Sequence, residues 1–393
     1  MLVRVRPIPA LLGVAGTYVL CHYIHAFAFL FFYLSACTIA LSLRLNRGRM
    51  LAYNSAFVFA ALGLFELYLV VVSPPPKSTF EGTYSSGGYF VQDDPDLGYS
   101  IKPERRVWTS ILKARDGSTI YDVKYSINQY GFRQGSPPLK PISQYDDKAV
   151  FFFGDSFTFG EGVNDEDTLP QQFSVASGIR VINFGVQGYG PHQMLRMLEI
   201  NRPRIVESND PLAIVYTILP SEHMVRAAGR RFWDERGPHY EVIDGALKYL
   251  GSFGGFPLLV RILRQSYIYS ALLDEKIRYI ITDNDRQRLL AILLRARDLS
   301  RSRYHAPFFV VLWGAYGDNP GDDTNENWVA QRLEENEVPT LQLTLSVPAL
   351  NSDGFRFPID GHPTANAYTL VANALKAFLD ADRLASGGVA LHH

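Results

Sequence analysis

The N-terminal part of this chain constrains its fold most, because it is almost free of charge. From Pro7 to Leu43 the sequence contains no Asp, Glu, Lys or Arg, and a second such run extends from Met50 to Phe65. A run of about 20 apolar residues is long enough for a helix to cross the hydrocarbon core of a bilayer. We therefore expect residues 1–76 to form a transmembrane anchor of two or three helices.

The second run gives the simpler span. Leu51 to Val72 is interrupted only by Glu66 and corresponds to about 33 Å of helix at about 1.5 Å per residue. Ser73 and Pro74–Pro76 follow at once, and proline removes backbone donors and clashes with a continuing helix. The span should end near Val72. Glu66 is interpreted either as a functional intramembrane acid or as a partly solvated acid at the interface.

The first run is too long for one span and just long enough for two short ones joined by a tight turn near His22–His25. Arginines flank it on both sides: Arg4, Arg6, Arg44, Arg47 and Arg49. Because basic residues stay on the cytoplasmic side, both ends of the run should be cytoplasmic, which favours a hairpin. The predicted location is the bacterial inner membrane, multi-pass, with everything after Pro76 on the periplasmic side. A cleaved signal peptide is the alternative, but no clear small-residue cleavage site follows a short apolar core.

Charge and cysteine content exclude several classes of protein. The 393 residues carry a formal net charge of −1, whereas a nucleic-acid-binding domain normally has a clear basic excess. The two cysteines, Cys21 and Cys37, both lie in the apolar N-terminal run. They indicate neither a disulfide framework nor a recognisable metal site. We expect no cofactor and no nucleic-acid partner.

The rest of the chain has two predicted parts. Residues 77–147 form an irregular β-rich lead-in, with an alternating stretch at Ile120–Ile127 that indicates a strand. Residues 148–385 alternate short apolar strands with helical segments, which is typical of a parallel α/β sheet. The predicted strands are 149–153, 180–184, 212–219, 307–313 and 340–343, and the predicted helices are 167–177, 191–203, 284–303, 325–336 and 364–381. An insertion at 221–283 interrupts the alternation, either as a cap over the site or as a packed embellishment.

Two short segments carry residues suited to catalysis. Strand 149–153 runs into Gly154-Asp155-Ser156-Phe157-Thr158, so Ser156 follows the carboxyl end of a parallel strand, where α/β sheets bind ligands. Thr158 stands where a Gly-x-Ser-x-Gly elbow would have glycine, and a helix N-cap serine is the alternative. Asp360-Gly361-His362-Pro363 precedes the final helix. There the carboxylate can orient the imidazole for proton transfer, although a plain turn or two metal ligands would show the same pattern.

Taken together, these segments resemble the SGNH (GDSL-like) hydrolase superfamily. The matching residues are Gly154-Asp155-Ser156, the block Asn183-Phe184-Gly185-Val186-Gln187-Gly188-Tyr189-Gly190, and Asp360 with His362, and the resemblance covers roughly residues 148–381. Asp96-Leu97-Gly98-Tyr99 and Asn128-Gln129-Tyr130-Gly131-Phe132-Arg133 also resemble membrane-anchored members that are associated with bacterial cell-surface polysaccharides.

The resemblance implies a three-layer flavodoxin-like domain with a serine hydrolase site. Ser156 would be the nucleophile, His362 the general base and Asp360 its orienting partner, while Asp155 would tie the turn by hydrogen bonds. The backbone N–H groups of Ser156 and Gly188 would form the oxyanion hole, because donors aimed at the developing negative charge contribute much of the rate.

The sequence departs from the family pattern in two places. Asp360 precedes His362 by two residues, whereas the commoner spacing is three. The family's third oxyanion donor, an Asn in a Gly-x-Asn-Asp block, is replaced by the segment Leu219-Pro220-Ser221-Glu222-His223. Either Ser221 or His223 would then supply that donor.

The function implied is an extracytoplasmic esterase that removes acyl groups, most simply O-acetyl groups, from a polysaccharide or glycoconjugate through an acyl-serine intermediate. An O-acyltransferase supplied by a membrane acyl-transfer partner would use the same site, and a non-catalytic polysaccharide-binding or assembly protein would retain only the fold. The expected partners are the glycan and the lipid bilayer. Four aromatic residues of the insertion would stack on sugar rings or belong to the core: Phe232, Trp233, Tyr240 and Tyr249.

Overall fold

The computed structural model describes most of the chain in two compact units. It describes residues 27–45, 48–72, 81–84, 91–104, 106–114, 116–135, 148–255, 263–264, 266–314, 322–352, 354–358 and 360–385. The first unit combines Met1–Ser78 with Phe256–Ile280, and the second combines Thr79–Gly255 with Ile281–His393.

The first unit contains a pair of apolar helices, α2 (Phe27–Ser42) and α3 (Arg49–Val72). They pack against each other, and the hydroxyl of Ser35 donates a 2.8 Å hydrogen bond to the carbonyl of Ala56. Among the described residues only α3, over Arg49–Leu69, is long and apolar enough to cross a membrane, and α2 is a shorter apolar helix. The predicted second span therefore forms a helix that ends at Val72, as expected. The second half of the first run forms α2. Its first half, the predicted turn at His22–His25 and Pro74–Pro76 lie outside the described residues.

The second unit is built on a five-stranded parallel sheet. Its strands are β6 (Ala149–Phe153), β7 (Arg180–Asn183), β8 (Ala213–Ile218), β11 (Phe308–Leu312) and β12 (Thr340–Gln342). They lie in the order β7-β6-β8-β11-β12. Numbered along the chain this order is 2-1-3-4-5, which is the flavodoxin-like arrangement. The predicted α/β class is confirmed, and all five predicted strands are present.

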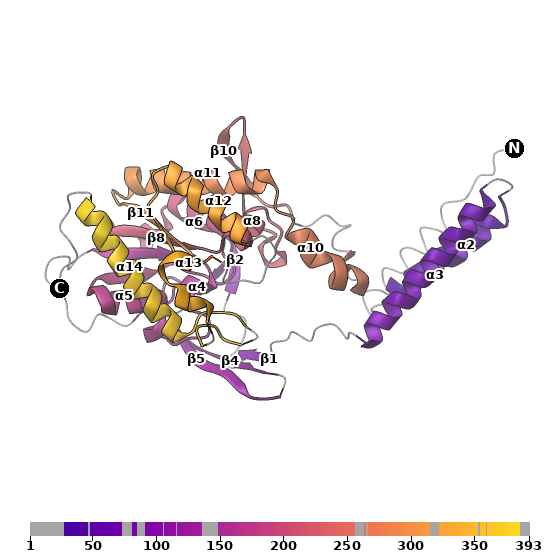
Figure 1. The fold of residues 1–393 in the computed structure, drawn as a ribbon, viewed down its shortest axis with the longest axis horizontal. Coiled ribbons are helices and arrows are strands. Elements are labelled where there is room, and N and C mark those ends of the chain that lie inside the picture. The colour runs from indigo at the N-terminus through magenta and orange to yellow at the C-terminus, as the bar shows by residue number, and fades with distance from the viewer. Residues whose placement is uncertain are drawn as a thin grey trace. The chain divides into compact units, whose positions relative to one another are not determined.

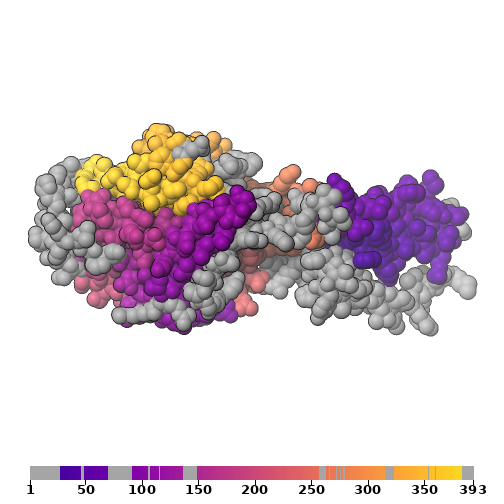
Figure 2. Space-filling model, turned by 90° about the horizontal axis from the view of Figure 1, so that it is seen from below, coloured from indigo at the N-terminus to yellow at the C-terminus, as the bar shows by residue number. Residues whose placement is uncertain are grey.

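Helices cover both faces of this sheet, so the domain has three layers (Figure 1). Alternate residues of each strand face opposite layers, as the pleat requires: Phe151 and Phe153 pack on one side, Val150 and Phe152 on the other. One layer contains α6 (Pro191–Glu199), α7 (Arg202–Val206), α8 (Pro220–Ala227), α11 (Asp283–Arg303) and α12 (Asp322–Glu335). The other contains η1 (Asp165–Asp167), α5 (Leu169–Ser177), α13 (Leu343–Ser346), η4 (Pro348–Asn351) and α14 (Ala365–Ala385). The yellow α14 lies against the pink α5 region on the face seen in Figure 2.

One predicted helix differs from the structure. The segment 191–203 is not continuous, because α6 ends at Glu199 and α7 starts at Arg202. Asn201 between them adopts a left-handed conformation with φ of 56°, and Pro203 at the start of α7 cannot donate a backbone hydrogen bond. A helical period alone does not reveal this break, since the apolar positions continue through it.

The lead-in belongs to the same unit as the parallel sheet. It forms a three-stranded antiparallel sheet, β1 (Glu81–Tyr84), β4 (Arg106–Lys113) and β5 (Thr119–Ile127), and a hairpin, β2 (Val91–Asp94) and β3 (Gly98–Ile101). The side chains of Trp108 and Tyr125 are buried in the core that also contains Phe153 of β6. The lead-in and the parallel sheet therefore share one continuous core.

The insertion 221–283 is divided between the two units. Its first part carries most of α8, the 3₁₀ turn η2 (Phe232–Asp234) and an antiparallel hairpin, β9 (Pro238–Ile243) and β10 (Ala246–Ser252). Its second part, within Phe256–Ile280, carries the π-helical turn η3 (Tyr269–Asp274) and α10 (Glu275–Arg278) and groups with the apolar helices of the first unit.

Candidate active site

Ser156 lies where strand β6 turns into the short helix α4 (Ser156–Phe159). Asp155 caps this helix, since its Oδ1 accepts a 2.9 Å hydrogen bond from the N–H of Phe157. Gly154 is required by space: a Cβ there would overlap the hydroxyl oxygens of Thr158 and Thr217. Asp155, not Ser156, is therefore the capping residue, and the Ser156 side chain stays available for chemistry.

His362 and Asp360 meet Ser156 from the loop before α14. Ser156 Oγ lies 2.8 Å from His362 Nε2, and Asp360 Oδ2 lies 2.9 Å from His362 Nδ1. The first contact is a hydrogen bond. The second contact is an ion pair whose angles do not meet those of a hydrogen bond. Gly361 between the two residues has φ of 75°, a conformation that glycine adopts freely. The turn at Gly361 allows the Asp360 carboxylate to contact the His362 imidazole, although the two residues are only two positions apart in the sequence.

Burial and a neighbouring carboxylate have opposite effects on the pKa of His362. Burial lowers the pKa of its imidazole, but the Asp360 carboxylate more than offsets this effect, with smaller contributions from Glu161 and Asp155, so that the pKa is raised above its usual value. A base whose pKa lies near the working pH combines an adequate neutral fraction with a strong drive to accept the proton.

A buried ionic cluster supports the turn from behind. Asp155 Oδ2 lies 2.9 Å from a terminal nitrogen of Arg226 and 3.3 Å from His223 Nε2. Burial raises the pKa of Asp155, yet Arg226 and His223 more than reverse this, and the net pKa is well below the usual range. Arg226 also pairs with Glu222 at 2.8 Å. Asp155 is thus held ionised by its neighbours, which fits the predicted structural role.

The loop that carries Gly188 is fixed beside the Ser156 turn. The N–H of Val186 donates to the carbonyl of Gly154 at 3.2 Å, and the side-chain amide of Asn183 donates to the carbonyl of Thr158 at 2.9 Å. Gly188 has φ of 78°, and a Cβ there would lie 2.6 Å from Trp233 Nε1 and 2.7 Å from the Tyr99 hydroxyl. Glycine is needed at this position for both backbone conformation and space.

The two candidates for the third oxyanion donor differ in their bonding. Both ring nitrogens of His223 already have partners, because Nδ1 lies 2.8 Å from the Tyr216 hydroxyl and Nε2 contacts Asp155. The Ser221 hydroxyl accepts a 2.9 Å hydrogen bond from the amide of Asn325 and keeps its own hydrogen to donate. Of the two side chains, Ser221 thus keeps a hydrogen that is not used by the contacts above.

Several supporting residues were not predicted as site residues. Arg133 is buried and donates to the carbonyls of Phe159, Gly160 and Val163 at 3.0, 2.5 and 2.6 Å, so it holds the chain that leaves the Ser156 helix. Glu161 is also buried, and its carboxylate accepts from the Tyr125 hydroxyl at 3.0 Å. Arg133 is the last residue of the sequence motif Asn128–Arg133. That motif was the sequence signal that could have indicated a role for Arg133.

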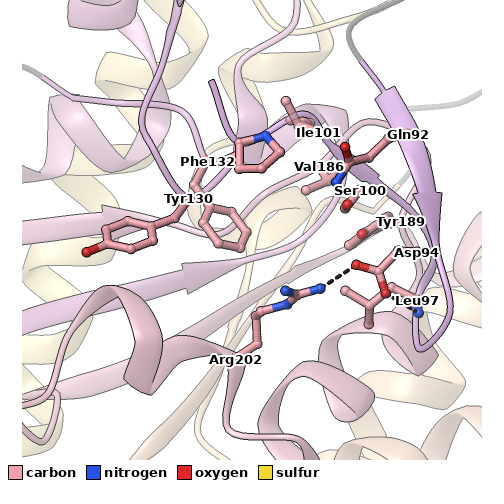
Figure 3. A pocket seen from close by; sticks show the side chains of 12 residues that line it. Gln92, Asp94, Leu97, Ser100, Ile101, Tyr130, Phe132, Val186, Tyr189 and Arg202 are labelled. Carbon is pink, nitrogen blue, oxygen red and sulfur yellow. Dashed lines mark hydrogen bonds and ion pairs between the residues drawn. The ribbon is translucent and has the colours of Figure 1, made fainter. Parts of the chain in front are cut away.

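A small pocket lies next to the Gly188 loop, and its lining does not include Ser156, Asp360 or His362 (Figure 3). It lies between the β2–β3 hairpin and the start of α7, where Asp94 and Arg202 form an ion pair. Its volume is about 60 Å³, which has room for a few ordered waters and is too small for a sugar ring. Within the described part of the chain, no group of three or more His, Cys, Asp or Glu side chains is placed to hold a metal ion.

The arrangement can perform acyl transfer by nucleophilic catalysis. A serine hydroxyl hydrogen-bonded to an imidazole, which in turn faces a carboxylate, is the constellation that activates serine in several unrelated folds. It lies between the carboxyl ends of β6 and β8, the switch point where open α/β sheets bind their ligands. The roles predicted for Ser156, His362 and Asp360 are chemically consistent with these positions.

Comparisons with known proteins give only distant structural likenesses. No family model matches the chain, and no curated protein matches it. Similar solved structures include a member of the lipolytic G-D-S-L family from Veillonella parvula, with 15% identity, TM-score 0.35 and coverage of 59% of this chain and 98% of that one. A psychrotrophic esterase from Pseudoalteromonas sp. has 12% identity, TM-score 0.35 and coverage of 59% and 97%.

An acetyl xylan esterase from the rumen bacterium Butyrivibrio proteoclasticus shows 12% identity and a TM-score of 0.34, with coverage of 65% of this chain and 67% of that one. These three structures are thus described as two esterases and a member of the lipolytic G-D-S-L family. At these identities and TM-scores they do not bear on the activity of this chain, which is argued from its own geometry.

Proposed function

We propose that this protein is a membrane-anchored serine esterase of the SGNH type that removes acyl groups, most simply O-acetyl groups, from a polysaccharide or glycoconjugate outside the cytoplasm. The observation that carries the proposal is the 2.8 Å hydrogen bond between Ser156 Oγ and His362 Nε2, with the Asp360 carboxylate 2.9 Å from the other ring nitrogen. The flavodoxin-like strand order adds support, since it puts the serine at the ligand-binding edge of the sheet.

The reaction follows from these positions in two steps. Ser156 Oγ attacks the ester carbonyl carbon while its proton moves to His362 Nε2, and the N–H groups of Ser156 and Gly188 stabilise the oxyanion. The bond from that carbon to the sugar oxygen then breaks, and His362 returns the proton to the leaving hydroxyl. In the second step water attacks the acyl-serine, gives a proton to His362, and releases the acid together with the restored serine hydroxyl.

The membrane and glycan parts of the proposal have separate support. Helix α3 has the length and composition of a membrane span, and the distribution of arginines around the apolar runs favours a periplasmic catalytic domain. The glycan substrate is inferred from the motifs Asp96–Tyr99 and Asn128–Arg133. They resemble motifs of superfamily members that are associated with bacterial cell-surface polysaccharides. A reporter fused after Lys77 tests the orientation, because activity of a cytoplasm-only reporter there would exclude it.

The catalytic part is tested with a fluorophosphonate probe on the detergent-solubilised full chain. We expect Ser156→Ala to abolish labelling and hydrolysis of p-nitrophenyl acetate, and Ser352→Ala, at an exposed serine outside the site, to retain both. Equal, weak labelling of the native chain and Ser156→Ala would instead favour a non-catalytic glycan-binding or assembly protein.

An O-acyltransferase remains the alternative, because a sugar hydroxyl can resolve the same acyl-serine in place of water. Adding an unacetylated oligosaccharide to the p-nitrophenyl acetate reaction distinguishes the two activities. Free acetate as the main product supports the esterase, and acetylated oligosaccharide as the main product would replace it by the transferase.

A further inference from the structure

Two exposed aromatic side chains lie beside the loop that carries Gly188. Phe232 and Trp233 belong to η2 and expose 62% and 38% of their surface. Their rings pack edge to face with centroids 5.0 Å apart. The indole N–H of Trp233 donates a 3.1 Å hydrogen bond to the carbonyl of Gly188. Phe232 and Trp233 together are called the aromatic platform. Through Trp233 the platform is hydrogen-bonded to the loop that carries Gly188.

The platform is fixed by a buried cluster under it. Asp234, the next residue, is fully buried, and its carboxylate lies 2.5 Å from His192 Nε2 and 2.6 Å from the amide of Gln193. His192 and Gln193 open α6, directly after the Gly188 loop. A rigid platform loses little conformational entropy when a ligand binds.

The other two aromatic residues considered from the sequence, Tyr240 and Tyr249, pack on each other. Tyr240 is buried, with its hydroxyl donating to Glu199 at 2.6 Å, and Tyr249 packs on Tyr240 with the Arg196 guanidinium 4.2 Å from its ring centroid. Of the four aromatic residues considered from the sequence, Tyr240 belongs to the core. Tyr249 exposes 37% of its surface, but its ring contacts Tyr240 and Arg196. Phe232 and Trp233 face solvent, and Trp233 is bonded to the loop that carries Gly188.

We propose that Phe232 and Trp233 bind a pyranose ring of the substrate next to Ser156, an inference that rests on the proposed function. The apolar C–H face of a sugar carries partial positive charge and suits the negative face of an aromatic ring. The buried Arg231, which pairs with Glu222, lies over the Trp233 ring at 5.4 Å from its centroid, and the exposed Arg236, three residues after Trp233, pairs with Asp93. Exposed rings with polar groups close by in the sequence fit a ligand with C–H faces and hydroxyl edges better than an acyl chain.

The test compares p-nitrophenyl acetate with two acetylated pyranose probes, O-acetylated xylotetraose and O-acetylated mannotetraose, on the full chain in detergent. Phe232→Ala should lower kcat/KM for at least one oligosaccharide about fivefold more than for p-nitrophenyl acetate, a size typical of aromatic contacts. Val175→Ala, at an exposed apolar residue of α5, should change neither.

Trp233→Phe separates stacking from positioning, because it keeps a ring and removes the N–H to Gly188. It should lower kcat for all substrates and leave the KM for the oligosaccharide nearly unchanged. Equal effects of Phe232→Ala on all substrates would overturn the inference, as would hydrolysis of p-nitrophenyl acetate with no turnover of either oligosaccharide. If p-nitrophenyl acetate is not hydrolysed and Ser156 is not labelled, the proposed function itself fails.

A second observation concerns Glu66, the acid inside α3. Its side chain is fully buried although α3 is the candidate span. Its carboxylate accepts hydrogen bonds from the Ser266 hydroxyl at 2.9 Å and from the N–H groups of Tyr267 and Ile268 at 2.6 and 3.0 Å. These donors start the helical segment that continues through η3 and α10, so Glu66 caps a helix from 200 residues away in the sequence.

Glu66 lies near one end of α3, the candidate membrane span. Glu66 precedes the last residue of α3, Val72, by six positions, or about 9 Å at about 1.5 Å per residue. The capped segment exposes four large apolar side chains: Leu272, Leu273, Ile277 and Ile280. We infer that residues 266–280 lie in the membrane–water interface with these side chains in lipid, an inference that rests on the proposed membrane anchor.

Quenching by spin-labelled lipids tests this inference on the full chain in lipid nanodiscs, with Cys21 and Cys37 replaced by Ser. A bimane probe on Ile277→Cys should be quenched by nitroxide near the head group, and one on Val175→Cys of α5 should not. Glu66→Leu should reduce quenching at position 277, since it removes the cap.

A probe on Phe57→Cys, an exposed position of α3, reports the anchor itself. Quenching at 57 without quenching at 277 would overturn the interfacial segment alone. No quenching at 57 would overturn the membrane anchor. Because Ile277→Cys retains Glu66, the result at 277 decides the matter even where Glu66→Leu fails to fold.

Discussion

The hydroxyl of Tyr99 donates a 2.7 Å hydrogen bond to the carbonyl of Gln187, the residue before Gly188. In return, the Tyr189 hydroxyl donates to the carbonyl of Tyr99 at 2.5 Å, and the two tyrosine rings pack edge to face. A tyrosine of the lead-in thus holds both sides of Gly188, the residue proposed to donate to the oxyanion. The geometry of this loop depends on a segment that precedes the catalytic sheet.

Gly188→Ala should remove most activity. The new Cβ would meet Trp233 Nε1 and the Tyr99 hydroxyl at under 3 Å, so the loop must shift and its N–H would leave the oxyanion. Loss of one such donor costs about 10²–10³ in kcat. Gly245→Ala is the matched control, because Gly245 has φ of 76° with no atom within 4 Å of its Cβ position. Measured kcat on p-nitrophenyl acetate should fall only for Gly188→Ala; equal losses would contradict a role for this loop.

Asp360→Asn should change both the rate and its pH dependence. His362 acts as a base only when neutral, and Asp360 raises its pKa, so activity of the native protein should decline as the pH falls through a value above the usual histidine pKa of about 6.5. Without the carboxylate, the pKa of His362 falls and the acidic limb of kcat/KM moves to lower pH, while kcat drops roughly 10²-fold or more. A limb that does not move would show that Asp360 is not the partner of His362.

Arg133→Lys should destabilise the loop after Ser156. Lysine cannot reproduce the planar fork that reaches the carbonyls of Phe159, Gly160 and Val163, and buried carbonyls without a donor cost about 1–3 kcal/mol each. We expect a lower thermal unfolding midpoint, measured by tryptophan fluorescence, together with a lower kcat. Arg332→Lys, at a half-exposed arginine of α12, should leave both values unchanged.

Arg226→Met should show how much the buried ionic cluster contributes. The variant leaves Asp155 and Glu222 without their shared cation, and breaking a buried pair in this way costs about 3–5 kcal/mol. Lys376→Met, which breaks a partly exposed pair with Asp380, should cost less than about 1 kcal/mol. The thermal unfolding midpoints are measured at pH 7. An equal fall in midpoint for the two variants would contradict a stabilising role for the cluster.

The same cluster predicts an acid dependence. The folded-state pKa of Asp155 lies below its ordinary value, so its stabilising contribution is complete above the unfolded pKa of about 3.9 and is lost as the pH falls toward the folded pKa. Arg226→Met raises the folded pKa of Asp155. Between pH 7 and pH 3 the native protein should therefore lose more stability than the variant does.

Ser221→Ala tests the third oxyanion donor. Ser221 has a hydroxyl hydrogen left to donate after accepting from Asn325, so the substitution should lower kcat by about 10² or more while KM stays nearly constant. Asn325→Ala should have a smaller effect in the same direction, because it only releases the Ser221 hydroxyl from its orienting contact. An unchanged kcat for Ser221→Ala would leave the site with two backbone donors.

The local pattern of apolar and polar residues determined most of the secondary structure of this protein. It also located the two segments that carry Ser156 and His362. Five apolar runs became the five parallel strands, and Ser156 and His362 stand at the strand end and before the final helix where the sequence puts them. These features are set by neighbours a few residues away, so they can be found without the fold. The break at Asn201 is the exception, since the apolar period continues across a residue in a left-handed conformation.

Only the tertiary structure decided which distant groups meet. Ser156 and His362 are 206 positions apart, Arg133 bonds to carbonyls 26 to 30 positions away, and Glu66 caps a helix of the insertion. These partners are mostly backbone carbonyl and N–H groups, which every residue type carries alike. The sequence therefore marks the side chain that must be satisfied, while the path of the folded chain selects the group that satisfies it.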